Sequence, residues 1–252
     1  MDMCLHDRVY VVTGASRGLG RATAQTLVDE GARVVVSSRR AASVQATVES
    51  LGGSVATGVV ADNADPATPQ LLIDAAMSAY GRLDGALISV GGPAAGSVLD
   101  ITDDQWEAAF GAVFLGAVRL ARALAGALSA EGSIVFVLST SVKQPIPGLS
   151  VSNGLRPGLA MVAKTLADEL GPRGIRVNGL LPGRVDTERV RELDAAGGDA
   201  EAVKRAATEA IPLRRYGEPA EFGRAAAFVL SPAASYITGA MLPVDGGITR
   251  SL

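Results

Sequence analysis

The chain has 252 residues, of which 48% are hydrophobic, and this suits one α/β domain with a large core. Its formal net charge of -3 and the lack of a basic run argue against a nucleic-acid-binding surface. Cys4 is the only cysteine, so no intrachain disulfide can form, and this usage suits a reducing compartment.

Two segments bear on location. The stretch Met1 to Arg8 carries two aspartates and an arginine where a signal peptide needs an apolar core. The longest apolar region, Ala108 to Leu128, is interrupted by Arg119 and Arg122, which favours a buried helix over a membrane span. We therefore expect a cytoplasmic protein without a membrane partner.

Strand-like apolar runs alternate with helical segments along the whole chain. The expected strands are Val9–Val12, Arg33–Ser37, Val55–Val60, Leu83–Val90, Ser133–Ser139, Ile175–Leu180 and Met241–Val244. The expected helices are Gly18–Glu30, Ser43–Leu51, Pro69–Tyr80, Asp103–Leu128, Leu155–Leu170 and Pro219–Leu230. Such alternation, with short connections and no linker, predicts one α/β domain over residues 1–252, with a Rossmann-type, doubly wound parallel sheet and helices on both faces.

The first strand leads into a glycine-rich turn and a helix. Val9–Val12 is followed by Thr13-Gly14, and Gly18 and Gly20 open the next helix. Glycines let the backbone approach a phosphate closely, and the first N–H groups of a helix point at an anion with the helix dipole behind them. The strand–helix context argues against an empty glycine-rich turn. With Thr13 and Ser16-Arg17, the stretch TGASRGLG resembles the fingerprint of the short-chain dehydrogenase/reductase family.

The resemblance implies a dinucleotide cofactor held by the first turn. Its phosphates would lie against the residues of that turn, namely Gly14, Ser16, Arg17, Gly18, Leu19 and Gly20. After the second strand the chain reads Ser37-Ser38-Arg39-Arg40, without the acidic residue that binds the ribose of NAD. We therefore expect NADP(H), with Arg17, Ser38 and Arg39 around the 2'-phosphate. The alternative is that both arginines are ordinary solvated surface residues.

Other cofactor contacts are implied further along the chain. Asp62, followed by Asn63, matches the family's aspartate that accepts from the adenine amino group. Ser89-Val90-Gly91-Gly92 stands where the family usually has Asn-Asn-Ala-Gly, so both asparagines are missing, although Gly91 still permits a close backbone approach. The turn beside the nicotinamide carboxamide is matched by Pro182, Gly183, Val185 and Thr187.

The catalytic set departs from the family pattern. The fifth strand ends in Ser139, at the place of the family's active-site serine. Alignment through the next helix puts Ser152 at the tyrosine position, 13 residues after Ser139, and Arg156 at the lysine position. Val113 falls on the asparagine position, so three of the four catalytic positions are substituted.

These substitutions change the proton chemistry. Serine is shorter and far less acidic than the phenol it replaces, whose pKa is about 10. Arg156 can hold the ribose but is a poor proton donor, so Lys143 or a bound water is the expected acid. Pro157 is expected to disturb the helix at Arg156 and so distort its spacing from Ser152. The charged, alanine-rich residues Thr187 to Pro212 are expected to form a mobile lid.

The sequence therefore favours an NADPH-dependent carbonyl reductase of the oxoacyl-carrier-protein-reductase-like branch. Its partners would be a small carbonyl or alcohol substrate and further copies of the chain in a homotetramer or homodimer, and no metal site is expected. One alternative is a non-catalytic NADPH-binding sensor or partner subunit. A third reading is a lyase resembling the halohydrin-cleaving relatives, but those keep the tyrosine and lose the phosphate loop, the reverse of this chain.

Overall fold

A computed structural model, which describes residues 2–251, has a seven-stranded parallel sheet at its centre. The strands are β1 (Val9–Val12), β2 (Arg33–Ser38), β3 (Ala56–Val60), β4 (Gly85–Ile88), β5 (Ser133–Val137), β6 (Arg176–Pro182) and β7 (Met241–Val244). Their order is β3-β2-β1-β4-β5-β6-β7, and every neighbouring pair is parallel. The predicted Rossmann-type sheet is confirmed, with the reversal of strand order between β1 and β4.

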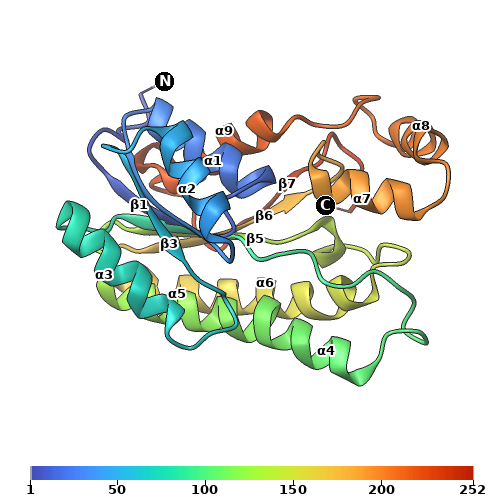
Figure 1. Cartoon of the computed structure of the whole chain (residues 1–252), viewed down its shortest axis with the longest axis horizontal. Helices are drawn as coiled ribbons and strands as arrows, with labels where there is room; N and C mark the ends of the chain where they lie inside the picture. Colours follow the sequence, from blue (N-terminus) through green and yellow to red (C-terminus); the bar gives the residue numbers. More distant parts are fainter. Residues whose placement is uncertain (1, 252) are drawn as a thin grey trace.

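Helices cover both faces of the sheet (Figure 1). One face carries α1 (Gly18–Asp29), α2 (Ala41–Leu51) and α9 (Pro219–Leu230). The other carries α3 (Thr68–Tyr80), α5 (Gly116–Ala127) and α6 (Ser150–Leu170). Three short 3-10 helices, η2 (Thr140–Val142), η3 (Gly171–Arg173) and η4 (Pro232–Ala234), lie in the connections.

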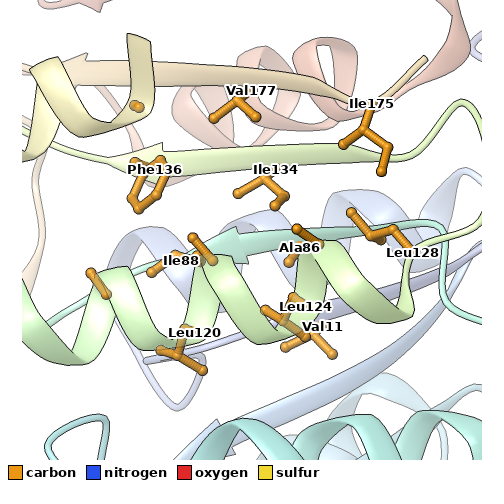
Figure 2. Packing of buried hydrophobic residues seen from close by; sticks show 14 of the residues in the cluster. Val11, Ala86, Ile88, Leu120, Leu124, Leu128, Ile134, Phe136, Ile175 and Val177 are labelled. Atoms are coloured by element: carbon orange, nitrogen blue, oxygen red, sulfur yellow. The ribbon is translucent and has the colours of Figure 1, made fainter. Parts of the chain in front are cut away.

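Because both faces are covered, the two central strands β1 and β4 are buried along their whole length. Figure 2 shows Leu124 of α5 beside Val11 of β1, and Ile134 and Phe136 of β5 belong to the same core; all four side chains have 0% exposure. Burying a side chain of this size stabilises the fold by about 1.5–3 kcal/mol relative to leaving it in water.

The predicted helix Asp103–Leu128 is continuous but not regular. It begins at α4 (Asp103–Ala109), where Thr102 and Gln105 form a capping box, widens into a π-helical segment η1 (Phe110–Leu115), and continues as α5. By length and composition alone, the 25-residue helix Asp103–Ala127 is long and apolar enough to cross a membrane. The buried face of α5 instead belongs to the core beneath the sheet.

Helix α6 begins at Ser150, five residues before the predicted start at Leu155. The early start is held by contacts with residues outside the helix: Ser150 Oγ donates to the Gly96 carbonyl at 2.8 Å, and the Asn153 amide donates to the Ile146 carbonyl at 2.9 Å. Pro157 therefore lies inside the helix and leaves the Asn153 carbonyl without its helical donor.

The region predicted to be a mobile lid contains two helices that the sequence analysis did not identify. They are α7 (Glu188–Ala196) and α8 (Ala200–Ala210), and they lie together beyond one end of the sheet (Figure 1). Each begins at a capping side chain, Thr187 for α7 and Asp199 for α8. The strand ends also differ slightly, since β4 stops before Val90 and β5 before Ser139.

Candidate functional site

The candidate site lies at the carboxyl ends of β1 and β4, where the strand order reverses. Thr13 Oγ1 donates to the Ser89 carbonyl at 2.8 Å, and the Ser89 N–H donates back to Thr13 Oγ1 at 2.9 Å. Asn63 Nδ2 also donates to the Ser89 carbonyl, at 3.3 Å. Ligands of open parallel sheets bind in the crevice at such a reversal.

The glycine turn after β1 is packed so closely that side chains cannot replace two of its glycines. Gly14 has a φ of +60°, and a Cβ there would lie 2.9 Å from the Ser89 carbonyl oxygen. A Cβ on Gly20 would lie 2.5 Å from the Gly14 carbonyl oxygen. Arg17 precedes α1 without a side-chain cap, so the first amides of α1 remain available to an anion.

The end of β2 offers hydroxyl and guanidinium groups but no carboxylate. Ser37 Oγ and Ser38 Oγ are buried and have no hydrogen-bond partner among the residues that the structure describes. Arg39 follows them and is exposed. Unpaired buried hydroxyls are costly, so these two fit a site that a ligand with acceptor oxygens completes. The phosphate turn and the end of β2 together fit a dinucleotide cofactor.

The remaining residues predicted for the adenine side have mixed environments. The exposed Asp62 uses its carboxylate in a local turn, accepting from the Ala64 N–H at 3.0 Å. Asn63 points to the crevice through its contact with Ser89. Gly91 is exposed directly beyond β4.

The loop after β6 lies beside the phosphate turn. Pro182 ends β6 and Gly183 follows it; Val185 then pairs with Gly217, and the Thr187 N–H donates to the Val185 carbonyl at 2.7 Å. Thr187 Cγ2 lies 3.5 Å from the position that a Cβ on Gly18 would take. The fold thus joins two candidate cofactor segments that are far apart in the sequence.

Arg17, predicted to hold a phosphate, already has carboxylate partners in the free protein. Its Nη1 lies 2.7 Å from Glu188 Oε2 and 3.4 Å from Glu192 Oε1, both on α7. The hydrogen bond that Arg17 donates to the Glu188 carboxylate raises the pKa of Arg17 above its ordinary value. Nothing local in the chain links these two glutamates to the first turn, so the sequence alone does not indicate them.

The hydroxyl nearest to Ser152 comes from Ser141, not from the predicted Ser139. Ser141 Oγ and Ser152 Oγ are 3.2 Å apart and both side chains are buried. Ser139 Oγ accepts from the Ser141 N–H at 3.1 Å and caps η2. The sequence Ser139-Thr140-Ser141 contained the signal, since it offers three hydroxyls at the strand end. Lys143 follows η2 and is exposed.

Arg156 is buried, and Nη1 donates to the Val137 carbonyl at 2.5 Å. Within residues 2–251 it forms no ion pair, and burial lowers its pKa to about 10, so it stays protonated at neutral pH. Ser152 and Arg156 both contact the chain at the end of β5, so the expected distortion by Pro157 is wrong: α6 runs regularly through both residues.

Val113 lies in η1, is 3% exposed and packs in the core beneath the sheet. It therefore brings no polar group to the place where the family pattern has asparagine. A pocket of about 290 Å³ lies between α1 and the start of α7, lined by residues such as Arg21, Gln25 and Arg191. None of the residues predicted to be catalytic lines it.

A sequence model of the family described as enoyl-(acyl carrier protein) reductase matches residues 14–249. The chain belongs to the short-chain dehydrogenase/reductase family. It is an oxidoreductase of that type, in the ketoacyl-reductase-like branch. This short-chain dehydrogenase/reductase is 34% identical over 253 residues to human dehydrogenase/reductase SDR family member 4, with 98% of this chain and 90% of the relative covered.

Solved structures of the family superpose closely on this chain. L-sorbose reductase from Gluconobacter frateurii, complexed with NADPH and L-sorbose, has a TM-score of 0.92 and 28% identity, with 100% of both chains covered. The 3-ketoacyl-(acyl-carrier-protein) reductase from Brucella melitensis, complexed with NADH, has a TM-score of 0.87 and 28% identity, covering 97% of this chain and 99% of that one.

Proposed function

We propose that this protein is an NADPH-dependent reductase of a small carbonyl compound, of the 3-oxoacyl type. The observation that carries the proposal is the end of β2. There the buried hydroxyls of Ser37 and Ser38, which have no hydrogen-bond partner among the described residues, precede Arg39. This segment contains no carboxylate that would repel a phosphate. A nicotinamide cofactor is supported by the relatives that were solved with NADPH and with NADH.

The glycine turn and the first amides of α1 would hold the diphosphate, and Arg17, Ser38 and Arg39 the 2'-phosphate. On the adenine and nicotinamide sides, the contacts would come from Asp62, Asn63, Gly91, Pro182, Gly183, Val185 and Thr187. A bound nicotinamide supplies a hydride to the carbonyl carbon.

At the catalytic end, the hydroxyl of Ser139 would orient the carbonyl oxygen. Arg156 would supply positive charge and hold the ribose, and Lys143 or water would supply the proton. A positioned general acid contributes about 10²–10⁴-fold, whereas orientation alone contributes about 7–11 kcal/mol. Without the family's tyrosine, turnover is expected to be slow but measurable.

The cofactor assignment is tested by dissociation constants for NADPH and NADH. Two charge-assisted contacts of about 1.5–3 kcal/mol each give at least about tenfold tighter binding of NADPH. Arg39→Ala is expected to lose much of this preference, and Arg40→Ala, at the neighbouring arginine, is the matched control. Equal constants in the wild type, or an unchanged preference in Arg39→Ala, would contradict the assignment.

The proton assignment is tested by the reductase rates of point variants. Ser152→Ala is expected to change the rate only slightly, because an aliphatic hydroxyl is a very weak acid, while Lys143→Ala reduces it substantially. Ser152→Tyr alone should restore little, and Ser152→Tyr with Arg156→Lys should restore more. A fast wild type that loses activity in Ser152→Ala and ignores Lys143→Ala would show the assignment to be wrong.

A second candidate is a non-catalytic NADPH-binding sensor or partner subunit. It is favoured by the contacts of the substituted residues, since Ser152 bonds to Ser141 and Arg156 to the Val137 carbonyl. NADPH oxidation across a panel of ketones, diketones and quinones separates the two candidates when binding is measured alongside. Tight NADPH binding without turnover on the whole panel would favour the second.

We also propose that the chain forms a homodimer or homotetramer through the outer faces of α4, η1 and α6. Phe110 stacks on Phe114 with ring centroids 5.2 Å apart, and Phe110 is 46% exposed. Met161 on α6 is 67% exposed. Large apolar side chains exposed on neighbouring helices suit helix-on-helix packing between subunits.

A further inference from the structure

The first turn of α7 is joined to the phosphate turn by ion pairs. Glu188 and Glu192 are one helical turn apart, so both carboxylates face Arg17 at 2.7 and 3.4 Å from its Nη1. Arg17, in turn, immediately precedes α1, within the turn that is expected to take a phosphate. The Arg17 guanidinium, which is expected to bind the cofactor, is therefore also bound by carboxylates of α7.

Further contacts place the same turn of α7 across the crevice. Thr187, the N-cap of α7, lies against Gly18, with its Cγ2 3.5 Å from the position of a Cβ there. On the other side, Arg189 Nη2 donates to the Pro93 carbonyl at 2.7 Å, in the loop after β4. The start of α7 thus contacts both walls of the crevice at the end of the sheet where Figure 1 shows α7.

We propose that the carboxylate of Glu188, assisted by that of Glu192, binds the Arg17 guanidinium in the free protein. The 2'-phosphate of the cofactor then displaces these carboxylates from Arg17 when it binds. This rests on the proposed function, in which Arg17 is a ligand of that phosphate. A phosphate and a carboxylate both prefer the same donors of a guanidinium. Binding of a 2'-phosphorylated ligand therefore breaks the Arg17–Glu188 pair and frees the first turn of α7.

The diphosphate that NADH and NADPH share would be held by the glycine turn and the first amides of α1, so only the 2'-phosphate competes with Glu188 for the Arg17 side chain. NADH therefore leaves Arg17 paired and the start of α7 docked. Glu188 weakens the binding of 2'-phosphorylated ligands, and it couples the position of α7 to the kind of cofactor bound. The side chains are more than half exposed, at 57% for Arg17 and 56% for Glu188, so the pair is of the weak surface kind.

The first experiment measures dissociation constants by calorimetry for adenosine 2'-phosphate, NADPH and NADH. Glu188→Gln keeps the shape of the side chain and removes its charge. It is expected to bind the two 2'-phosphorylated ligands about two- to fivefold tighter, the gain from removing one exposed ion pair, and NADH unchanged. Glu201→Gln on α8 is the matched control, because Glu201 lies outside the Arg17 contact, and it should change none of the constants.

The second experiment follows hydrogen exchange of the α7 amides. Both cofactors would contact Thr187, the N-cap of α7, but only NADPH displaces Glu188, so exchange in the first turn of α7 is expected to be faster in the NADPH complex than in the NADH complex. Glu188→Gln should speed it already in the free protein.

The outcomes distinguish this inference from the cofactor assignment. If the wild type binds NADPH and NADH equally, the assignment is wrong and this inference fails with it. Only this inference is wrong if NADPH is preferred but Glu188→Gln changes neither the dissociation constants nor the hydrogen exchange of α7. The same holds if Glu188→Gln changes the dissociation constants of all three ligands equally.

Discussion

Two buried arginines show how context decides what a charged side chain does. Arg176 donates to four main-chain carbonyls, of Val229, Leu230, Ser231 and Ile237, three of them at the carboxyl end of α9. Among residues 2–251, the Val137 carbonyl is the one acceptor of Arg156. Buried polar groups are costly unless they are paired, so the first arginine stabilises the fold and the second stabilises it little or not at all.

Replacing each by methionine tests this difference. Arg176→Met leaves several buried carbonyls without a donor and should lower the free energy of unfolding by at least about 2 kcal/mol. Arg156→Met removes a desolvated charge. It should lower the free energy of unfolding by less than about 1 kcal/mol, or raise it. Urea unfolding followed by circular dichroism measures both, and an equal loss in the two variants would contradict the argument.

Glu221 gives the fold a pH dependence in the acid range. Its carboxylate pairs with Arg215 and accepts from the Glu218 N–H at 2.7 Å, which lowers its pKa from 4.5 to about 2. A carboxyl with a lowered pKa in the folded state stabilises the fold above its unfolded value, and this contribution is lost as pH falls. The stability difference between wild type and Glu221→Gln should be constant above about pH 5, shrink below 4.5 and vanish near 2.

At the scale of elements, α6 tolerates a proline that isolated helices do not. Pro157 lies seven residues after the start of α6 and leaves the Asn153 carbonyl without a helical donor. The helix persists because its ends and its inner face are held by other parts of the chain: Ser150 bonds to Gly96, and Leu159 and Ala163 are buried beneath the sheet.

Pro157→Ala should therefore raise the free energy of unfolding by about 1–3 kcal/mol, because it restores a donor and removes the ring's clash with the preceding turn. Pro219→Ala is the control. Pro219 is the first residue of α9, where no helical N–H is missing, so its replacement should be neutral or slightly destabilising. A loss of stability in Pro157→Ala would contradict this account of α6.

At the scale of the whole molecule, the outer faces of η1 and α6 predict self-association. Light scattering at micromolar concentration should give two or four times the mass of one chain. Met161→Glu should shift this mass toward the monomer, because it places a charge on the exposed apolar face; Met77→Glu on α3 is a control at another exposed methionine, 47% exposed. A wild-type monomer would count decisively against the proposed assembly.

The sequence by itself determined the architecture and the glycine turn after β1. Apolar runs of strand length predict β1 and β7 with their observed bounds; β1 is buried along its length in the covered sheet, and β7 is the edge strand beside β6. The glycines of the first turn are equally local, since Gly14 and Gly20 fit where a side chain does not. The helix α9 was predicted with its observed bounds, because Pro219 marks its first residue.

Only the tertiary structure decided which side chains meet at the site. Arg17 and Glu188 are 171 residues apart, and no local pattern announces their pairing. The start of α6 depends on contacts with Gly96 and Ile146, and the partner of Ser152 proved to be Ser141 because η2 turns the chain after β5. Propensity and periodicity act over a few residues, whereas these contacts arise once the sheet has brought distant loops to the same edge.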